Sequence, residues 1–246
     1  MINYYAPLNP EHFDAQFLGR REVLRVSDLG AQLAFGLSVL DQRGFFKTAS
    51  PRESLADKSA SPLLTWPFLD FVDAIDLRKR KLLELGAGTS TVWFSERFER
   101  VRSFETSAEW FTDVCRVVGA NVDLSLVDVA SLEAADIDYR GEDWMLVDFA
   151  GKRTKFLHNF FRKAPPTSTP SVVVLDNADW FRRGAAIITE SGYVEIPFSG
   201  FKTGQSWISC TSVFIAPQRV DLRQREPFVQ SSPFSRQTEN RWDSSE

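Results

Sequence analysis

Short apolar runs alternate with amphipathic segments from Arg80 onward, which is typical of repeated βα units around a mostly parallel sheet. The pattern predicts seven strands, near Lys81–Leu85, Val101–Phe104, Asp123–Val127, Trp144–Val147, Ser171–Leu175, Tyr193–Pro197 and Ile208–Ile215. Helical periodicity between them predicts helices near Ser90–Phe98, Ala108–Val118, Lys152–Lys163 and Trp180–Glu190. Only a Gly-containing loop, Ser199–Ser206, separates the last two strands, so these form an antiparallel hairpin at a sheet edge.

The segments outside this repeat predict a three-part chain. Residues 1–78 read as an N-terminal helical and irregular extension, in which Leu29, Leu33, Leu37 and Leu40 recur at helical spacing. The polar, Ser-rich stretch Thr48–Ser61 is expected to be a loop or a lid. Residues 79–218 form the α/β domain, and residues 219–246 are polar enough to predict a disordered tail.

Composition narrows the class of protein. A length of 246 residues with 43% hydrophobic residues fits one large domain with extensions. The formal net charge of −4 gives no basic surplus for nucleic acid or an anionic membrane, so neither partner is expected. Cys115 and Cys210 stand far apart, which argues against a disulfide framework and a zinc site. Without an apolar span or signal-like start, the protein is expected to be cytoplasmic.

A glycine turn follows the first predicted strand, in the segment KLLELGAGTST from Lys81 to Thr91. Gly86 and Gly88 allow a ligand to approach the main chain closely, because they carry no Cβ. Glu105 directly follows the second predicted strand, 17 residues beyond Gly88. This pairing of a bare turn with a carboxylate predicts a site for a nucleotide-like cofactor, with the start of the following helix suited to an anion.

Acidic residues follow the other predicted strands as well. In an open α/β sheet, ligands bind beyond the carboxyl ends of the strands. Glu105 is suited to accept both hydroxyl hydrogens of a ribose, and Asp128 is placed to contact an adenine edge. Asp148 follows the fourth strand, and Asp176 with Asn177 follows the fifth.

Four motifs, ELGAGTST, SFE, LVD and VVLDNADW, resemble the class I S-adenosylmethionine-dependent methyltransferases over roughly Arg80–Pro217. The resemblance implies the Rossmann-like fold of that family, with a glycine turn around the methionine part of the cofactor and Glu105 on its ribose. Ser90 stands where many members have a third glycine. The implied cofactor-binding residues are Glu84, Gly86, Ala87, Gly88, Thr89, Ser90, Glu105 and Asp128. A dinucleotide site fits less well, since the β-branched Thr91 stands at the third position of G-x-G-x-x-G.

A second resemblance concerns Asp148, Asp176 and Asn177, which match residues that hold magnesium in metal-dependent catechol-type O-methyltransferases. Hard divalent cations prefer such oxygen ligands. In that case Asp148 is also catalytic, and Lys152 is a candidate general base. The alternative is that these acidic residues cap helices or contact substrate directly, with Arg153 binding an acidic group of the substrate or pairing with a nearby carboxylate.

The function expected from this resemblance is methyl transfer from S-adenosylmethionine to an oxygen or nitrogen of a small-molecule substrate, in a protein that could form a homodimer. Two other classes stay open: a non-catalytic binding or scaffold protein with the same fold, and a nicotinamide-dependent oxidoreductase.

Overall fold

The computed structural model describes residues 36–37, 40–43, 45, 55, 61–163, 169–205 and 207–220. The chain forms two compact units, residues 1–43 and 44–246, and every element given bounds below lies in the second. The expected helix around Leu29 to Leu40, the loop Thr48–Ser61 and the tail after residue 220 lie almost entirely outside the described residues. Leu55 is an exception: it is buried against Ala87, Val92 and Val114.

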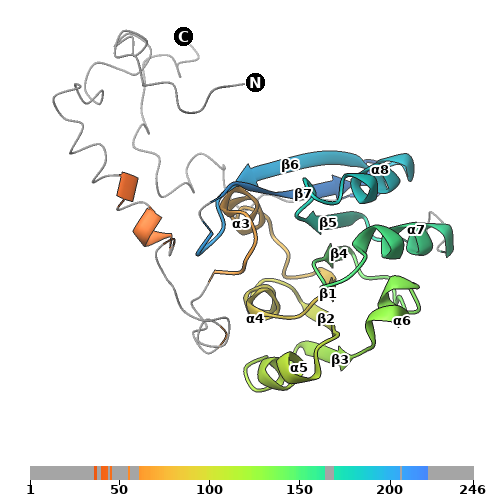
Figure 1. Ribbon diagram of the computed structural model, residues 1–246, viewed down its shortest axis with the longest axis horizontal. Helices are drawn as coiled ribbons and strands as arrows, with labels where there is room; N and C mark the ends of the chain where they lie inside the picture. Colours follow the sequence, from red (N-terminus) through yellow and green to blue (C-terminus); the bar gives the residue numbers. More distant parts are fainter. Residues whose placement is uncertain are drawn as a thin grey trace, which may run out of the picture. The chain divides into compact units, whose positions relative to one another are not determined.

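A seven-stranded sheet in the order β3-β2-β1-β4-β5-β7-β6 forms the centre of the second unit (Figure 1). The first five strands are parallel, β7 is antiparallel to β5, and β6 pairs with β7 at the edge. Their bounds are β1 Lys81–Leu85, β2 Arg100–Glu105, β3 Val122–Leu126, β4 Trp144–Val147, β5 Val172–Asp176, β6 Val194–Gly200 and β7 Ser209–Ile215. The predicted α/β sheet and its terminal hairpin are therefore confirmed.

Helices cover both faces of the sheet: α3, α4 and α5 lie on one side, and α6, α7 and α8 on the other (Figure 1). Their bounds are α3 Trp66–Asp73, α4 Thr89–Ser95, α5 Ala108–Cys115, α6 Val129–Glu133, α7 Arg153–Lys163 and α8 Arg182–Glu190. The short α6 was not expected from the sequence. None of the described helices has the length and apolar content needed to cross a membrane.

Burial explains the continuous apolar runs of the central strands. Every residue of β4 and β5 is buried, as are Leu82–Leu85 of β1, because helices pack on both faces. The edge strand β6 is largely exposed. Thr65 ties the start of α3 to the hairpin, since its amide donates to Thr211 Oγ1 (3.1 Å) and its hydroxyl to the Phe198 carbonyl (2.8 Å). These two hydrogen bonds of Thr65 hold the start of α3 against the β6–β7 hairpin, beside the edge of the sheet where the parallel strands end.

Candidate functional site

The carboxyl ends of β1, β2 and β4 meet at one edge of the sheet. The amide of Gly86 donates to the Phe104 carbonyl at 2.8 Å, and the amide of Asp148 donates to the Leu85 carbonyl at 2.8 Å. The hydrogen-bond ladder therefore continues into the residues that follow each strand. It brings together the glycine turn, Glu105 and Asp148, as the sequence predicted for parallel strands.

The two glycines of the turn have different roles. Gly86 has a φ of +98°, and a Cβ there would lie 2.6 Å from the Asp148 carbonyl oxygen, so the fold itself requires glycine. Gly88 is extended, with a φ of 177°, and an added Cβ would meet the Trp110 indole ring at 3.7 Å and 3.8 Å, which are ordinary contacts. The fold does not require glycine at residue 88, and its predicted role in letting a ligand approach the main chain stays a prediction.

Glu105 is directed at this turn. Its Oε2 accepts a hydrogen bond from the Ala87 amide at 3.0 Å, and its Oε1 accepts from the amides of Thr106 and Ser107, both at 2.7 Å. The residue is 7% exposed. These bonds fix the carboxylate beside the main chain of the glycine turn, and its contact with a ribose remains a prediction.

Glu84 stabilises the glycine turn from the buried side, through hydrogen bonds. It is fully buried, and its carboxylate accepts hydrogen bonds from the hydroxyls of Ser90 (2.6 Å), Thr91 (2.6 Å) and Ser103 (2.7 Å). Burial raises the pKa of Glu84 to about 7, against the opposing effect of these three hydroxyls. Glu84 thus anchors the glycine turn from the protein interior. Ser90, which stands where many class I methyltransferases have a third glycine, donates its hydroxyl to Glu84. The predicted direct contact of these two side chains with a cofactor has no support in this geometry.

Thr89 and Asp128 are placed at helix starts. Thr89 is half-buried at the first residue of α4. Asp128 is exposed and is the N-cap of α6: its carboxylate accepts from the Ser131 amide (2.9 Å) and hydroxyl (2.6 Å). The Ser131 hydroxyl, together with its amide, lowers the pKa of Asp128. The cap accounts for Asp128 without a cofactor, and its predicted contact with adenine remains a prediction.

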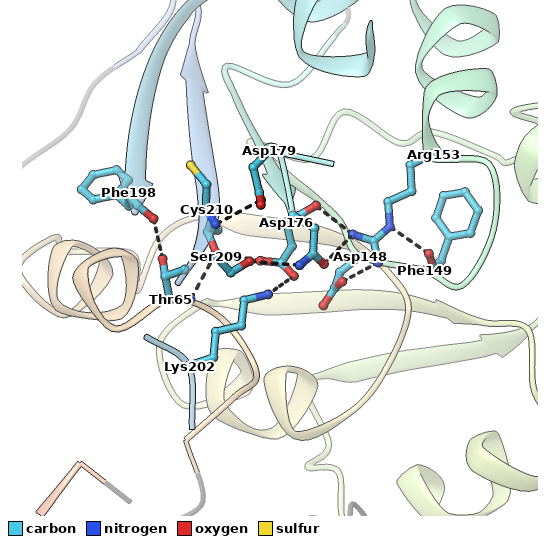
Figure 2. A network of polar contacts seen from close by, with 12 residues as sticks. Thr65, Asp148, Phe149, Arg153, Asp176, Asp179, Phe198, Lys202, Ser209 and Cys210 are labelled. Carbon is cyan, nitrogen blue, oxygen red and sulfur yellow. Dashed lines mark hydrogen bonds and ion pairs between the residues drawn. The ribbon is translucent and has the colours of Figure 1, made fainter. Parts of the chain in front are cut away.

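The three residues predicted to bind magnesium do converge, since Arg153 lies within hydrogen-bonding distance of all three. Two basic side chains lie among them: Figure 2 shows Arg153 beside Asp148 and Lys202 beside Asp176. Arg153, 8% exposed, donates to Asp148 Oδ1 at 2.7 Å, to the Phe149 carbonyl at 2.9 Å and to the Asp176 carbonyl at 2.8 Å. Asp176 is 1% exposed, and its Oδ2 lies 2.5 Å from the ammonium of Lys202. Its Oδ1 accepts from the Thr211 hydroxyl at 2.7 Å.

This arrangement does not fit a divalent cation. Both oxygens of Asp176 are engaged, and each carboxylate already has a positive partner within the protein. Among the described residues, no group of three or more His, Cys, Asp or Glu side chains is suited to hold a metal ion. The expectation of magnesium is therefore not supported, and Arg153 pairs with a carboxylate, the second of its two predicted roles.

Asp148 retains the properties of a candidate acid or base. Its side chain is 23% exposed. Burial and the neighbouring Asp176 carboxylate raise the pKa of Asp148 to about 7, although Arg153 and Lys202 act in the opposite direction. A carboxyl group with a pKa near neutrality can release and take up protons at physiological pH.

Lys152 does not join this group. It is exposed, its amide donates to Glu133 Oε1 at 3.0 Å, and it lines a groove between α7 and α8. The proposed role of Lys152 as a general base therefore has no support in the geometry. Lys202, which the sequence reading missed, is the lysine that approaches the acidic residues; it stands in the loop between β6 and β7, where no local motif marks it.

A scan against protein-family models and a search of curated proteins gave no match. Solved structures with a similar fold include precorrin-6y C5,15-methyltransferase from Geobacter metallireducens, with 15% identity, 61% of this chain and 86% of that chain covered, and a TM-score of 0.44. TYW2 of M. jannaschii in complex with AdoMet has 14% identity, coverages of 63% and 78%, and a TM-score of 0.42. The fibrillarin pre-rRNA processing protein of Methanococcus jannaschii has 16% identity, coverages of 68% and 76%, and a TM-score of 0.43.

The fold is defined by three features of the chain. Five strands are parallel with β1 at their centre, and β7 lies antiparallel between β5 and β6. The glycine turn after β1 faces Glu105 at the end of β2. The chain has a seven-stranded Rossmann-like fold, as the resemblance to the class I S-adenosylmethionine-dependent methyltransferases implied.

Proposed function

We propose that the protein transfers a methyl group from S-adenosylmethionine to an O–H or N–H group of a small molecule. The observation that carries the proposal is the direction of Glu105, whose carboxylate is held at 3.0 Å from the Ala87 amide inside the glycine turn. Gly88 supports it, because the fold alone leaves that glycine unexplained. The residues present therefore fit the adenosyl cofactor.

The main chain of Ala87 and Gly88 would hold the methionine part of the cofactor, and Glu105 would accept hydrogen bonds from its ribose hydroxyls. S-adenosylmethionine supplies a methyl group bound to a positively charged sulfur, and the neutral thioether that remains after transfer is a good leaving group. The protein contributes alignment of the acceptor and exclusion of water.

Asp148 is the group proposed to receive the proton of the acceptor. The Asp148 carboxylate would take up the O–H or N–H proton of the acceptor when the methyl group leaves the sulfur of S-adenosylmethionine, with S-adenosylhomocysteine as the leaving group. Arg153 holds Oδ1 of this carboxylate at 2.7 Å and so fixes its orientation. With a pKa of about 7, Asp148 is ionised and able to act as a base above neutral pH.

Exposed apolar side chains beside this edge support a small organic acceptor. Trp180, Trp207 and Ile208 are 66%, 52% and 60% exposed. Trp180 donates its amide to the Asn177 carbonyl at 2.8 Å, and Trp207 and Ile208 precede Ser209, whose hydroxyl contacts the Asn177 side chain at 3.1 Å. Both segments thus flank Asn177. Large exposed apolar groups around a few polar ones are typical of ligand sites.

The test is S-adenosylhomocysteine production with a panel of phenols and amines. Asp148→Asn should lower kcat by about 100-fold or more, the usual contribution of a general base, with the affinity for S-adenosylmethionine unchanged. Asp138→Asn, at an exposed acid paired with Arg140, is the matched control and should have wild-type activity. Cofactor binding without turnover on any acceptor would contradict the proposed reaction and favour a binding protein of the same fold.

A further inference from the structure

Lys202 is among the most deeply buried charged side chains of the described chain. It is 2% exposed, and its ammonium lies 2.5 Å from Oδ2 of Asp176, which is also 2% exposed at its side chain (Figure 2). A lysine is almost never buried to this extent without a partner, because taking its charge out of water is costly. The position of the ammonium is therefore fixed by the acidic residues around it.

The Asn177 amide contributes to the same surroundings. In the orientation that satisfies both ends of this amide, its nitrogen donates to Asp176 Oδ2 at 2.8 Å, and its oxygen accepts from Lys202 Nζ at 3.2 Å and from Ser209 Oγ at 3.1 Å. The ammonium thus faces one carboxylate oxygen and one amide oxygen. These are two of the oxygen ligands that a hard divalent cation would use.

The charges of the cluster balance without a metal ion. Asp148 pairs with Arg153 and Asp176 pairs with Lys202. A divalent cation at this place would have to displace the ammonium and would add uncompensated positive charge beside Arg153. We infer that the Lys202 ammonium is a built-in cation that takes the place of a divalent metal in this acidic cluster, so that the cluster is assembled without metal.

Lys202 also connects the acidic cluster to the start of α3. Its neighbour Phe201 accepts a hydrogen bond from the Trp66 amide at 2.9 Å, and the two rings lie 6.1 Å apart. Through its ion pair with Asp176, Lys202 therefore holds the β6–β7 loop at the end of β5, and the loop in turn contacts the start of α3. This inference concerns the resident cation of the cluster and does not depend on methyl transfer.

The experiment compares thermal unfolding in millimolar MgCl₂ and in EDTA for the wild type and Lys202→Ala. The wild type should unfold at the same temperature in both. Lys202→Ala leaves Asp176 without its cation, so its midpoint should fall in EDTA and rise with saturating MgCl₂. We expect the variant to bind Mg²⁺ at least about tenfold more tightly than the wild type, a difference of about 1.4 kcal/mol.

Lys155→Ala is the matched control, because this exposed lysine on α7 also has a carboxylate partner, Glu133 at 3.2 Å, and should show no response to MgCl₂. Saturable stabilisation of the wild type by MgCl₂ would overturn the inference. So would a folded Lys202→Ala protein that is indifferent to MgCl₂. If Lys202→Ala gives no folded protein, Lys202→Gln decides: it keeps a donor to Asp176 without the charge, and a lack of response to MgCl₂ would again overturn the inference.

Discussion

The buried carboxylate of Glu84 makes a quantitative prediction about stability and pH. Its pKa rises from the ordinary value of 4.5 to about 7 in the native protein, chiefly because it is buried. Between these two pH values the native state retains a proton that the unfolded state has released. The free energy of unfolding therefore falls as pH rises through this window, and the loss is complete above pH 7. Since one pKa unit corresponds to about 1.4 kcal/mol, the contribution of Glu84 is about 3 kcal/mol.

Glu84→Gln removes the titrating group while preserving its shape, and the hydroxyls of Ser90, Thr91 and Ser103 can donate to the amide oxygen or accept from its nitrogen. Urea unfolding followed by fluorescence, at pH 5 and at pH 8, gives the change in stability across the window for each protein. Because the unfolded carboxyl is already mostly ionised at pH 5, this change should be smaller in the variant by about 2 to 3 kcal/mol. Any constant cost of the substitution cancels, because each protein is compared with itself.

Asp148 titrates in the same window in both proteins. The main causes of its raised pKa, burial and the Asp176 carboxylate, are the same in both, and the Glu84 charge adds least, so most of the Asp148 contribution cancels. Glu99→Gln, the same substitution at an exposed acid, should leave the pH dependence unchanged. Parallel stability curves for the wild type and Glu84→Gln would refute the reasoning. They would mean that the three hydroxyls stabilise the ionised carboxylate enough to cancel the effect of burial.

Two further pairs of substitutions test the glycine turn and a buried ion pair elsewhere in the sheet. Gly86→Ala should destabilise the fold by about 3 kcal/mol or more in urea unfolding, because the new Cβ would lie 2.6 Å from the Asp148 carbonyl oxygen at a positive φ. Gly88→Ala should unfold like the wild type in urea but should bind the cofactor more weakly in calorimetry. Arg102→Met should cost about 3 to 5 kcal/mol in urea unfolding, because it leaves Glu142 as an unpaired charge in a site where both partners are about 5% exposed. Adding Glu142→Gln should recover part of that loss; an additive second loss would show that the pair is not coupled.

The sequence predicted the architecture because the signal lies in local patterns. Continuous apolar runs marked the central strands, and β1 and β4 have the predicted bounds. The hairpin followed from the lack of a helix between the last two apolar runs, and the glycine turn and Glu105 follow from positions directly after strands. The helix α6 was missed because it has only five residues, although Asp128 and Ser131 carry the spacing of an N-cap.

The magnesium expectation was not supported for a different reason. Two carboxylates and an amide at strand ends look alike from the sequence whether a metal or a lysine lies between them. The deciding residue, Lys202, stands 26 residues after Asp176 in a loop, and only the three-dimensional path of the β6–β7 hairpin brings it back. Arg153 was recognised as a candidate, but its two possible roles could be separated only by its contacts with Asp148 and Asp176. Side chains that neutralise one another across a fold leave no local motif.

The central claim is that the glycine turn and Glu105 together hold an adenosyl cofactor. Calorimetric titration with S-adenosylmethionine tests it most directly, using the wild type, Glu105→Gln and the control Glu99→Gln. The wild type and the control should bind with equal affinity, and Glu105→Gln should bind about 10- to 100-fold more weakly, since a hydrogen bond to a charged group contributes about 1.5 to 3 kcal/mol. Failure of the folded wild type to bind, or equal binding by Glu105→Gln, would contradict the account.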